Sequence, residues 1–235
     1  MKNIPEAIYA TYKADAPRKY LGGSIAGYGQ KCERQLWYRW KRNEDFEGRL
    51  LRLFEHGHIE EERVIRDLNR AGFQVIGNQL EATAFNGVFQ IHIDGLIMVD
   101  GKLSILEIKT SSVKRYTDLT QAWDMLTWDE PKLIGRHRKA LADFEIHHAQ
   151  MQLGMGLFGM TSACYLVVCK DNDEIHTREI PFDQEMFDGL MEMIGRVISS
   201  EAEPKRAVVA PDQHGVCQWC PGYDECWNGK LDFGF

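Results

Sequence analysis

The chain has 235 residues, of which 44% are hydrophobic and 27% are charged, so its composition is that of a folded protein and excludes disordered and collagen-like chains. Its 28 Lys and Arg residues against 35 Asp and Glu residues give a net charge of −7, which excludes a uniformly basic coat for nucleic acid but permits a local basic groove. No segment approaches the ~20 apolar residues of a membrane helix, and the N-terminal stretch lacks the apolar core of a secretory signal. We therefore expect no membrane partner, a cytoplasmic location and reduced cysteines.

The N-terminal part of the chain is predicted to be helical. Ser24 is a suitable N-cap, and the apolar residues that recur with helical spacing after Gly48 end before Gly72, a suitable C-terminal cap. The expected helices cover residues 5–15, 24–40 and 48–70.

The rest of the chain is predicted to mix strands and helices. Asp100-Gly101 is a strong hairpin signal between two β-rich segments. The expected strands cover residues 73–80, 88–99, 103–109, 163–169 and 174–180. The expected helices cover residues 114–126, 140–160 and 184–200, and a looser region follows them. This order predicts an α/β fold with a central mixed sheet flanked by helices.

Three charged residues of the predicted hairpin point to chemistry. Asp94 stands among apolar strand residues, and Glu107 and Lys109 are two positions apart, so they share one face of their strand. The turn at Asp100-Gly101 brings Asp94 opposite Glu107. Two close carboxylates repel each other unless a positive charge lies between them, and a hard divalent cation such as Mg²⁺ meets that need. Such a site could support metal-assisted phosphodiester hydrolysis. The alternative is that Glu107 and Lys109 are solvated positions of an edge strand.

The segment IHIDGLIMVDGKLSILEIKTSS, with Asp94 and Glu107-x-Lys109, resembles the PD-(D/E)xK nuclease motif and is most similar to the RecB-type exonucleases. The resemblance implies a restriction-endonuclease-like core. It also implies that Asp94, Glu107 and the backbone carbonyl of Ile108 hold Mg²⁺ or Mn²⁺, while Lys109 positions the attacking water.

Two flanking features extend the resemblance. Upstream, Gly57 and Glu61 match a G-x-x-x-E form that gives a glutamate to the metal site, whereas His58 matches a form that gives a histidine. His58 and Glu61 are three positions apart on the predicted helix, so they share a face. Downstream, Gln150 matches a helix glutamine that contacts substrate beside the active site, with Gln152 as the alternative.

The cysteines suggest a second metal centre. Three of them form Cys217-x2-Cys220-x5-Cys226, and Cys32 supplies a fourth ligand if the two ends of the chain meet. Four cysteines in a tetrahedral array suit zinc or an iron–sulfur cluster. One early cysteine followed by C-x2-C-x5-C resembles the iron–sulfur nucleases, including the CRISPR-associated RecB-like exonucleases and the AddB-type nuclease domain. The resemblance implies a 4Fe–4S cluster, and Zn²⁺ is the alternative.

Basic residues gather in segments 31–42 and 131–139, with Trp and Tyr residues in or near both. Basic groups interleaved with aromatic rings suit a path for single strands, through phosphate contacts and base stacking. The alternative is a pair of solvated basic faces over core tryptophans. The candidate DNA-binding residues are Arg34, Lys41, Arg42, Lys114, Arg136, Arg138 and Lys139.

Together these features predict a metal-dependent DNA exonuclease acting on single-stranded or duplex ends. We expect one nuclease domain, with a catalytic core over residues 48–203 and terminal segments 1–47 and 204–235 joined by the four cysteines. Recombination, repair, phage or CRISPR-related processing stay open as pathways, as does a protein partner from recombination or CRISPR adaptation. Two alternatives stay open: a non-catalytic DNA-binding subunit with zinc or a cluster, and a structure-selective endonuclease on the same fold.

Overall fold

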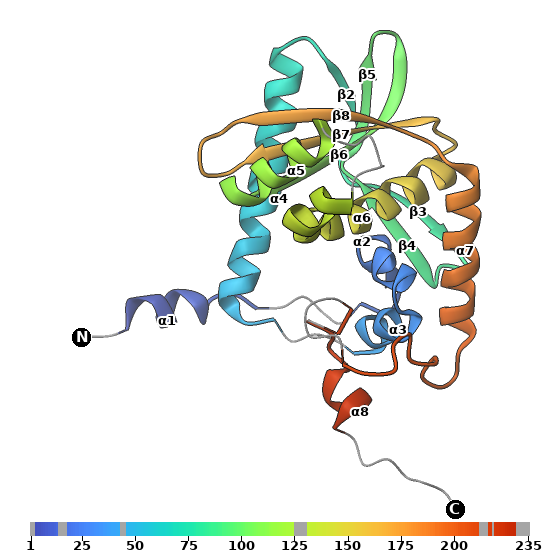
Figure 1. The fold of residues 1–235 in the computed structure, drawn as a ribbon. Coiled ribbons are helices and arrows are strands. Elements are labelled where there is room, and N and C mark those ends of the chain that lie inside the picture. Colours follow the sequence, from blue (N-terminus) through green and yellow to red (C-terminus); the bar gives the residue numbers. More distant parts are fainter. Residues whose placement is uncertain are drawn as a thin grey trace, which may run out of the picture.

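The structure is a computed structural model of the whole chain. It describes residues 3–13, 18–42, 46–124, 131–211, 216–217 and 219–228, without the side chains of 122–124 and 131–141. Figure 1 shows a central sheet with helices on both faces, and the blue N-terminal helices near the red C-terminal segment.

A five-stranded mixed sheet forms the centre of the molecule, with strand order β2-β5-β6-β7-β8. Its strands are β2 (Gln74–Ile76), β5 (Gly95–Val99), β6 (Lys102–Ser111), β7 (Ser162–Cys169) and β8 (Ile175–Pro181). Strands β6 and β7 are parallel, and the other neighbours are antiparallel. The two parallel strands are apolar along most of their length because both of their faces are covered.

A smaller three-stranded sheet lies beside the first, in the order β1-β4-β3. Its strands are β1 (Leu21–Gly22), β3 (Leu80–Ala84) and β4 (Phe89–Ile93). Only Asp94 separates β4 from β5 of the larger sheet. The chain therefore passes from one sheet to the other at this residue.

Helices cover both faces of the larger sheet (Figure 1). The helices are α1 (Ile4–Tyr9), α2 (Gly23–Ala26), the 3-10 helix η1 (Gly27–Gln30), α3 (Glu33–Lys41), α4 (Gly48–Arg70), α5 (Val113–Asp124), α6 (Pro131–Phe158), α7 (Gln184–Ser199) and α8 (Tyr223–Trp227). Helix α4 packs Val64, Ile65 and Leu68 on the face that carries Leu106 and Ile108. Among the described residues, no helix is long and apolar enough to cross a membrane.

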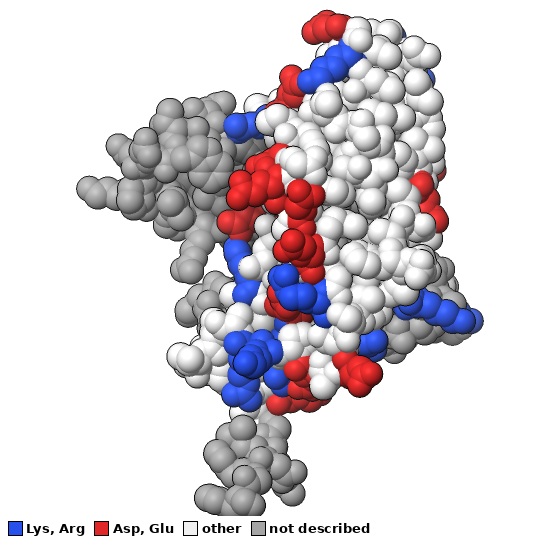
Figure 2. Space-filling view, turned by 90° about the vertical axis from the view of Figure 1, so that its right-hand side faces the viewer, with Lys and Arg blue, Asp and Glu red and all other residues white. Residues whose placement is uncertain are grey.

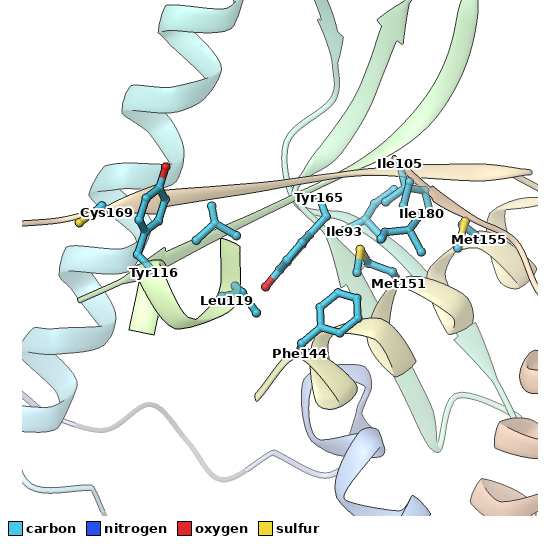
Figure 3. Packing of buried hydrophobic residues seen from close by; sticks show 12 residues of the cluster. Ile93, Ile105, Tyr116, Leu119, Phe144, Met151, Met155, Tyr165, Cys169 and Ile180 are labelled. Atoms are coloured by element: carbon cyan, nitrogen blue, oxygen red, sulfur yellow. The ribbon is translucent and has the colours of Figure 1, made fainter. Parts of the chain in front are cut away.

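The opposite face of the larger sheet packs against α5 and α6. Figure 3 shows Leu119 of α5 with Phe144 and Met151 of α6, gathered around Tyr165 and Ile105 of the sheet. Because side chains alternate along a strand, Glu107 and Lys109 lie on the same face of β6 as Ile105. The two charged residues therefore extend from the edge of an apolar core that α6 covers.

The expected helix over residues 24–40 is wrong. The structure divides it into α2, η1 and α3, and Cys32 is extended, with φ −160° and ψ 103°. Gly27 makes a close approach to α6: a Cβ there would lie 2.6 Å from the Ile146 Cα. The chain turns between α2 and α3, where the backbone of Gly27 lies close to that of Ile146. After this turn, Cys32 lies at the start of α3.

Two expected strands are each interrupted. The segment 73–80 contains β2, then a left-handed link with Gly77 at φ +75° and Gln79 at φ +51°, before β3 begins. The segment 88–99 is β4 and β5, in different sheets. The segment 88–99 keeps its period-2 pattern through the break at Asp94, whereas Gly77-Asn78 in the first segment is a turn signal that the expected strand ignored.

Two helix boundaries also differ. Helix α1 ends at Tyr9 and not near residue 15, and the Thr11 hydroxyl donates to the Ile8 carbonyl at 2.7 Å, a bond that competes with further helix. Helix α6 begins at Pro131 and not near residue 140, since proline suits the first turn of a helix.

The C-terminal segment closes onto α3. Arg39 donates to the Trp219 carbonyl, and Arg42 donates to the Pro221 carbonyl, both at 2.7 Å. Gly222 lies against the ring of Tyr38, where a Cβ would be 2.0 Å from a ring carbon. The described parts of the two chain ends are thus held together by hydrogen bonds from side chains to backbone carbonyls and by close packing, so the C-terminal segment closes onto α3 as expected.

Candidate active site

The bend between the two sheets places Asp94 opposite Glu107. The β5–β6 ladder ends where Gly95 pairs with Leu106, so the residue before Gly95 faces the residue after Leu106. Beyond this point the Ile108 N–H donates to Asp94 Oδ2 at 2.6 Å. In an antiparallel ladder a residue directs its N–H and C=O toward the same neighbour, so the Ile108 carbonyl also lies on the Asp94 side of β6.

Glu107 is fully buried and has two partners. Gln150 of α6 donates to its Oε2 at 3.3 Å, and the Lys109 ammonium lies 2.5 Å from its Oε1. Oε1 therefore lies in an ion pair with the ammonium, and it has no other hydrogen-bond partner among the described residues. A buried carboxylate oxygen that is held by an ammonium alone keeps a lone pair through which it can also bind a cation.

The charges of the site shift each other's ionisation. Burial raises the pKa of Glu107 to about 7, with the charges of Asp94 and Glu61 adding to the rise and Lys109 opposing it. Burial also raises the pKa of Glu61, and Asp94 adds to that rise. Burial alone would lower the pKa of Lys109, but Glu107 and Asp94 together outweigh it and raise that pKa. Lys109 therefore stays protonated at neutral pH.

Helix α4 brings a third carboxylate to the site. Gln79 donates its amide to Asp94 Oδ1 at 2.9 Å and to Glu61 Oε2 at 3.2 Å, so one side chain links the two acids. His58 Nδ1 lies 3.4 Å from the same Glu61 oxygen, but the His58 side chain is 71% exposed and that of Glu61 only 21%. Of the two candidates on α4, Glu61 is the one that faces Asp94.

The structure separates the two candidate glutamines of α6. Gln150 contacts Glu107, as described above. Gln152 is tied instead to the loop before α7, where it donates to the Pro181 carbonyl at 2.9 Å and accepts from the Asp183 N–H at 2.8 Å. Only Gln150 therefore belongs to the candidate site.

These residues fit a hard divalent cation. Among the described residues, no three His, Cys, Asp or Glu side chains are already gathered as the ligands of an ion. Three carboxylates nevertheless converge from α4, β6 and the bend, and the buried Oε1 of Glu107 has the Lys109 ammonium as its one partner among the described residues. Carboxylate and carbonyl oxygens are the donors that Mg²⁺ and Mn²⁺ prefer. Asp94, Glu107, Glu61 and the Ile108 carbonyl are the residues that would hold it.

Sequence reasoning missed two features of the site. Gln79 was placed inside an expected strand, and only the left-handed link after β2 turns it toward the acids. The second is the pair formed by His147 and Tyr165, with His147 Nδ1 2.7 Å from the Tyr165 hydroxyl. Burial lowers the pKa of His147 to about 3, helped by Lys109, so this histidine is neutral. Tyr165 lies beside Glu107 in the β6–β7 register, and no local sequence signal marks that pairing.

The four predicted cluster cysteines line one cavity between α3, α8 and the C-terminal segment. They are Cys32, Cys217, Cys220 and Cys226. Burial raises the pKa of the Cys220 thiol, and Cys32 and Cys226 add to the rise. The donor set fits a thiolate-bound metal, although the thiols are not arranged around a common point.

The predicted DNA-binding residues fall into three groups. Arg34 pairs with Glu203, and Arg42 holds the C-terminal segment, so both have partners within the chain. Lys41 and Lys114 are exposed. The side chains outside the described residues are those of Arg136, Arg138 and Lys139. In Figure 2, basic side chains gather at the lower end of the molecule, while much of the upper face carries none of the described charged residues.

The fold has known counterparts. No family model matches the sequence, and no curated protein matches it. The alkaline exonuclease LHK-Exo from Laribacter hongkongensis aligns over 83% of this chain and 91% of its own, with a TM-score of 0.51 and 14% identity. A phage-related exonuclease from Haemophilus somnus 129PT aligns over 80% of this chain and 94% of its own, with a TM-score of 0.49 and 14% identity. The likeness to LHK-Exo shows a shared fold, and the predicted α/β class with a central mixed sheet is confirmed.

Proposed function

We propose that this protein is a metal-dependent DNA exonuclease. The observation that carries the proposal is the convergence of Asp94, Glu107 and Lys109 at the bend between β4 and β5. The fold supports it, because LHK-Exo, which is described as an alkaline exonuclease, shares this fold. Opposed carboxylates beside a protonated lysine suit phosphodiester hydrolysis.

Each residue of the site has a distinct role in this proposal. A bound Mg²⁺ or Mn²⁺ would polarise the phosphate and lower the pKa of water. Because Lys109 stays protonated at neutral pH, it acts as a donor that orients the attacking water and stabilises the charge on phosphate oxygens. Gln150 holds Glu107 Oε2 and Lys109 pairs with Oε1, so both oxygens of Glu107 have a fixed position. Asp94, Glu107, Ile108 and Glu61 supply cation ligands, with His58 as the peripheral alternative to Glu61.

The four cysteines are assigned a separate, structural role. We place a 4Fe–4S cluster, with Zn²⁺ as the alternative, in the cavity that they line. The cluster would join terminal segments 1–47 and 204–235 across a catalytic core of residues 48–203. This role is supported by the contacts of Arg39 and Arg42 with the C-terminal segment, since Cys32 and the three C-terminal cysteines line the same cavity.

DNA is proposed to approach the site across the exposed basic residues Lys41 and Lys114, with Arg136, Arg138 and Lys139 on α6. Arg34 and Arg42 serve mainly to hold the chain ends, since both make contacts within the protein. Phosphate contacts of this kind position the substrate without reading its sequence. Binding is therefore expected to weaken steeply with salt.

The test is digestion of end-labelled DNA with Mg²⁺ or Mn²⁺, and with EDTA as the metal-free arm. Asp94→Asn is expected to lower cleavage by about 10²-fold or more, because it removes a charged cation ligand. The matched control is Asp100→Asn in the turn of the same hairpin, which should cleave normally. Near wild-type cleavage by Asp94→Asn would contradict the assignment, and cleavage of closed circular DNA would identify an endonuclease.

A further inference from the structure

Gln79 occupies the place between two candidate cation ligands. Its amide nitrogen lies 2.9 Å from Asp94 Oδ1 and 3.2 Å from Glu61 Oε2. Both partners are carboxylates that only accept hydrogen bonds when ionised, so the amide must present its NH₂ group to them. This arrangement places a neutral double donor where two negative charges would otherwise face each other.

The other oxygen of Asp94 is already engaged. Oδ2 accepts from the Ile108 N–H at 2.6 Å, a bond that also ends the β5–β6 ladder. Oδ1 is therefore the oxygen that remains for a cation, and it is the one that Gln79 holds. A cation ligated by Asp94 Oδ1 and Glu61 Oε2 would lie between them and be repelled by amide hydrogens that point to the same place.

Gln79 can leave without disturbing the core. Its side chain is exposed, and the residue belongs to the short link between β2 and β3. The link has two left-handed residues, Gly77 and Gln79, which fix the direction in which the side chain leaves the backbone. A rotation about the side-chain bonds is thus enough to free both carboxylates.

We propose that Gln79 is a placeholder for the cation: its amide bridges Asp94 and Glu61 in the metal-free protein, and cation binding displaces it. The proposal rests on the proposed function, because it takes these carboxylates to be cation ligands. The bridge stabilises the two carboxylates when no cation is bound, and it weakens cation affinity because the cation must break the same hydrogen bonds.

The test compares Gln79→Met, which keeps the length of the side chain and removes the amide, with Gln74→Met as the matched control. Gln74 lies on β2 of the same segment, is exposed, and makes no side-chain hydrogen bond among the described residues. In EDTA, Gln79→Met is expected to lower the melting temperature by about 4 °C. In calorimetric titration with Mn²⁺, the same variant is expected to bind about tenfold more tightly than wild type. The control should change neither quantity.

Failure of the proposed function and failure of the placeholder proposal would give different results. Wild-type protein that bound no Mn²⁺ would overturn both the proposed function and the placeholder. Mn²⁺ binding that was lost in Asp94→Asn but equal or weaker in Gln79→Met would leave the function standing and overturn the placeholder. An unchanged melting temperature of Gln79→Met in EDTA would also overturn it, because the bridge would then stabilise nothing.

Discussion

Cation binding is expected to depend on pH because the buried carboxyl of Glu107 must lose its proton first. Burial raises its pKa to about 7, so at pH 6 about nine tenths of the metal-free protein carries this proton. The apparent affinity for Mn²⁺ should then fall about tenfold for each pH unit below 7 and stay level above it. The raised pKa of Glu61 acts in the same direction and would make the fall steeper.

The assay is calorimetric titration with Mn²⁺ at pH 6 and pH 8, repeated in two buffers with different heats of ionisation. About one proton should be released on binding at pH 6 and none at pH 8. Glu107→Gln is the matched variant: it should bind more weakly and lose most of the pH dependence. Equal wild-type affinity and no proton release at both pH values would refute the reasoning.

The same pKa has an opposite consequence for the stability of the metal-free protein. The pKa of the Glu107 carboxyl is about 7 in the folded protein and about 4.5 in the unfolded chain, so the folded protein binds this proton more tightly. This preference stabilises the folded protein fully below pH 4.5, and the stabilisation is lost as the pH rises through 7. The loss is on the order of 3 kcal/mol, because the pKa rises from 4.5 to about 7 and each pH unit corresponds to ~1.36 kcal/mol. Unfolding in EDTA should therefore become easier from pH 5 to pH 8, and Glu107→Gln should show a flatter profile.

Two further predictions concern the C-terminal segment. Gly222→Ala should lower the melting temperature by several degrees, because the added methyl meets the Tyr38 ring at 2.0 Å. Gly189→Ala is the control, since an added methyl there has nothing within 4 Å and should not lower the melting temperature. Equal melting temperatures of Gly222→Ala and wild type would contradict this packing. Cys32→Ser should lose bound iron or zinc in metal analysis and also lose stability, whereas Cys164→Ser should retain the metal. Full metal content in Cys32→Ser would exclude it as a ligand.

Local sequence patterns predicted the helices and strands whose formation depends on residues close together in the chain. Helix α4 has the expected bounds, Gly48–Arg70, because its apolar spacing and terminal glycine are properties of one segment. The hairpin is confirmed as well, with Asp100 and Gly101 in left-handed conformations at the turn. Its register follows from the turn, so the approach of Asp94 to Glu107 could be read from the sequence.

Features that depend on packing between distant segments could not be predicted. The Gly77-Asn78 pair indicates a turn before Gln79, but it does not show that this turn aims the Gln79 amide at Asp94. The contact between His147 and Tyr165 requires α6 to pack on β7, which no local pattern encodes. The break of the early helix before α3 likewise depends on the approach of Gly27 to α6.

Asp94 both completes the hydrogen bonding at the end of the β5–β6 ladder and belongs to the candidate site. When the ladder ends at Gly95, the Ile108 N–H is left without a strand partner, and a buried N–H without an acceptor costs about 1–3 kcal/mol. The Asp94 carboxylate accepts that N–H, so the residue that would bind the cation also completes the sheet. Asp94→Ala would remove both contributions, and a loss of activity could then reflect a disturbed strand. Asp94→Asn keeps an oxygen acceptor for Ile108, which is why it isolates the loss of charge from the loss of structure.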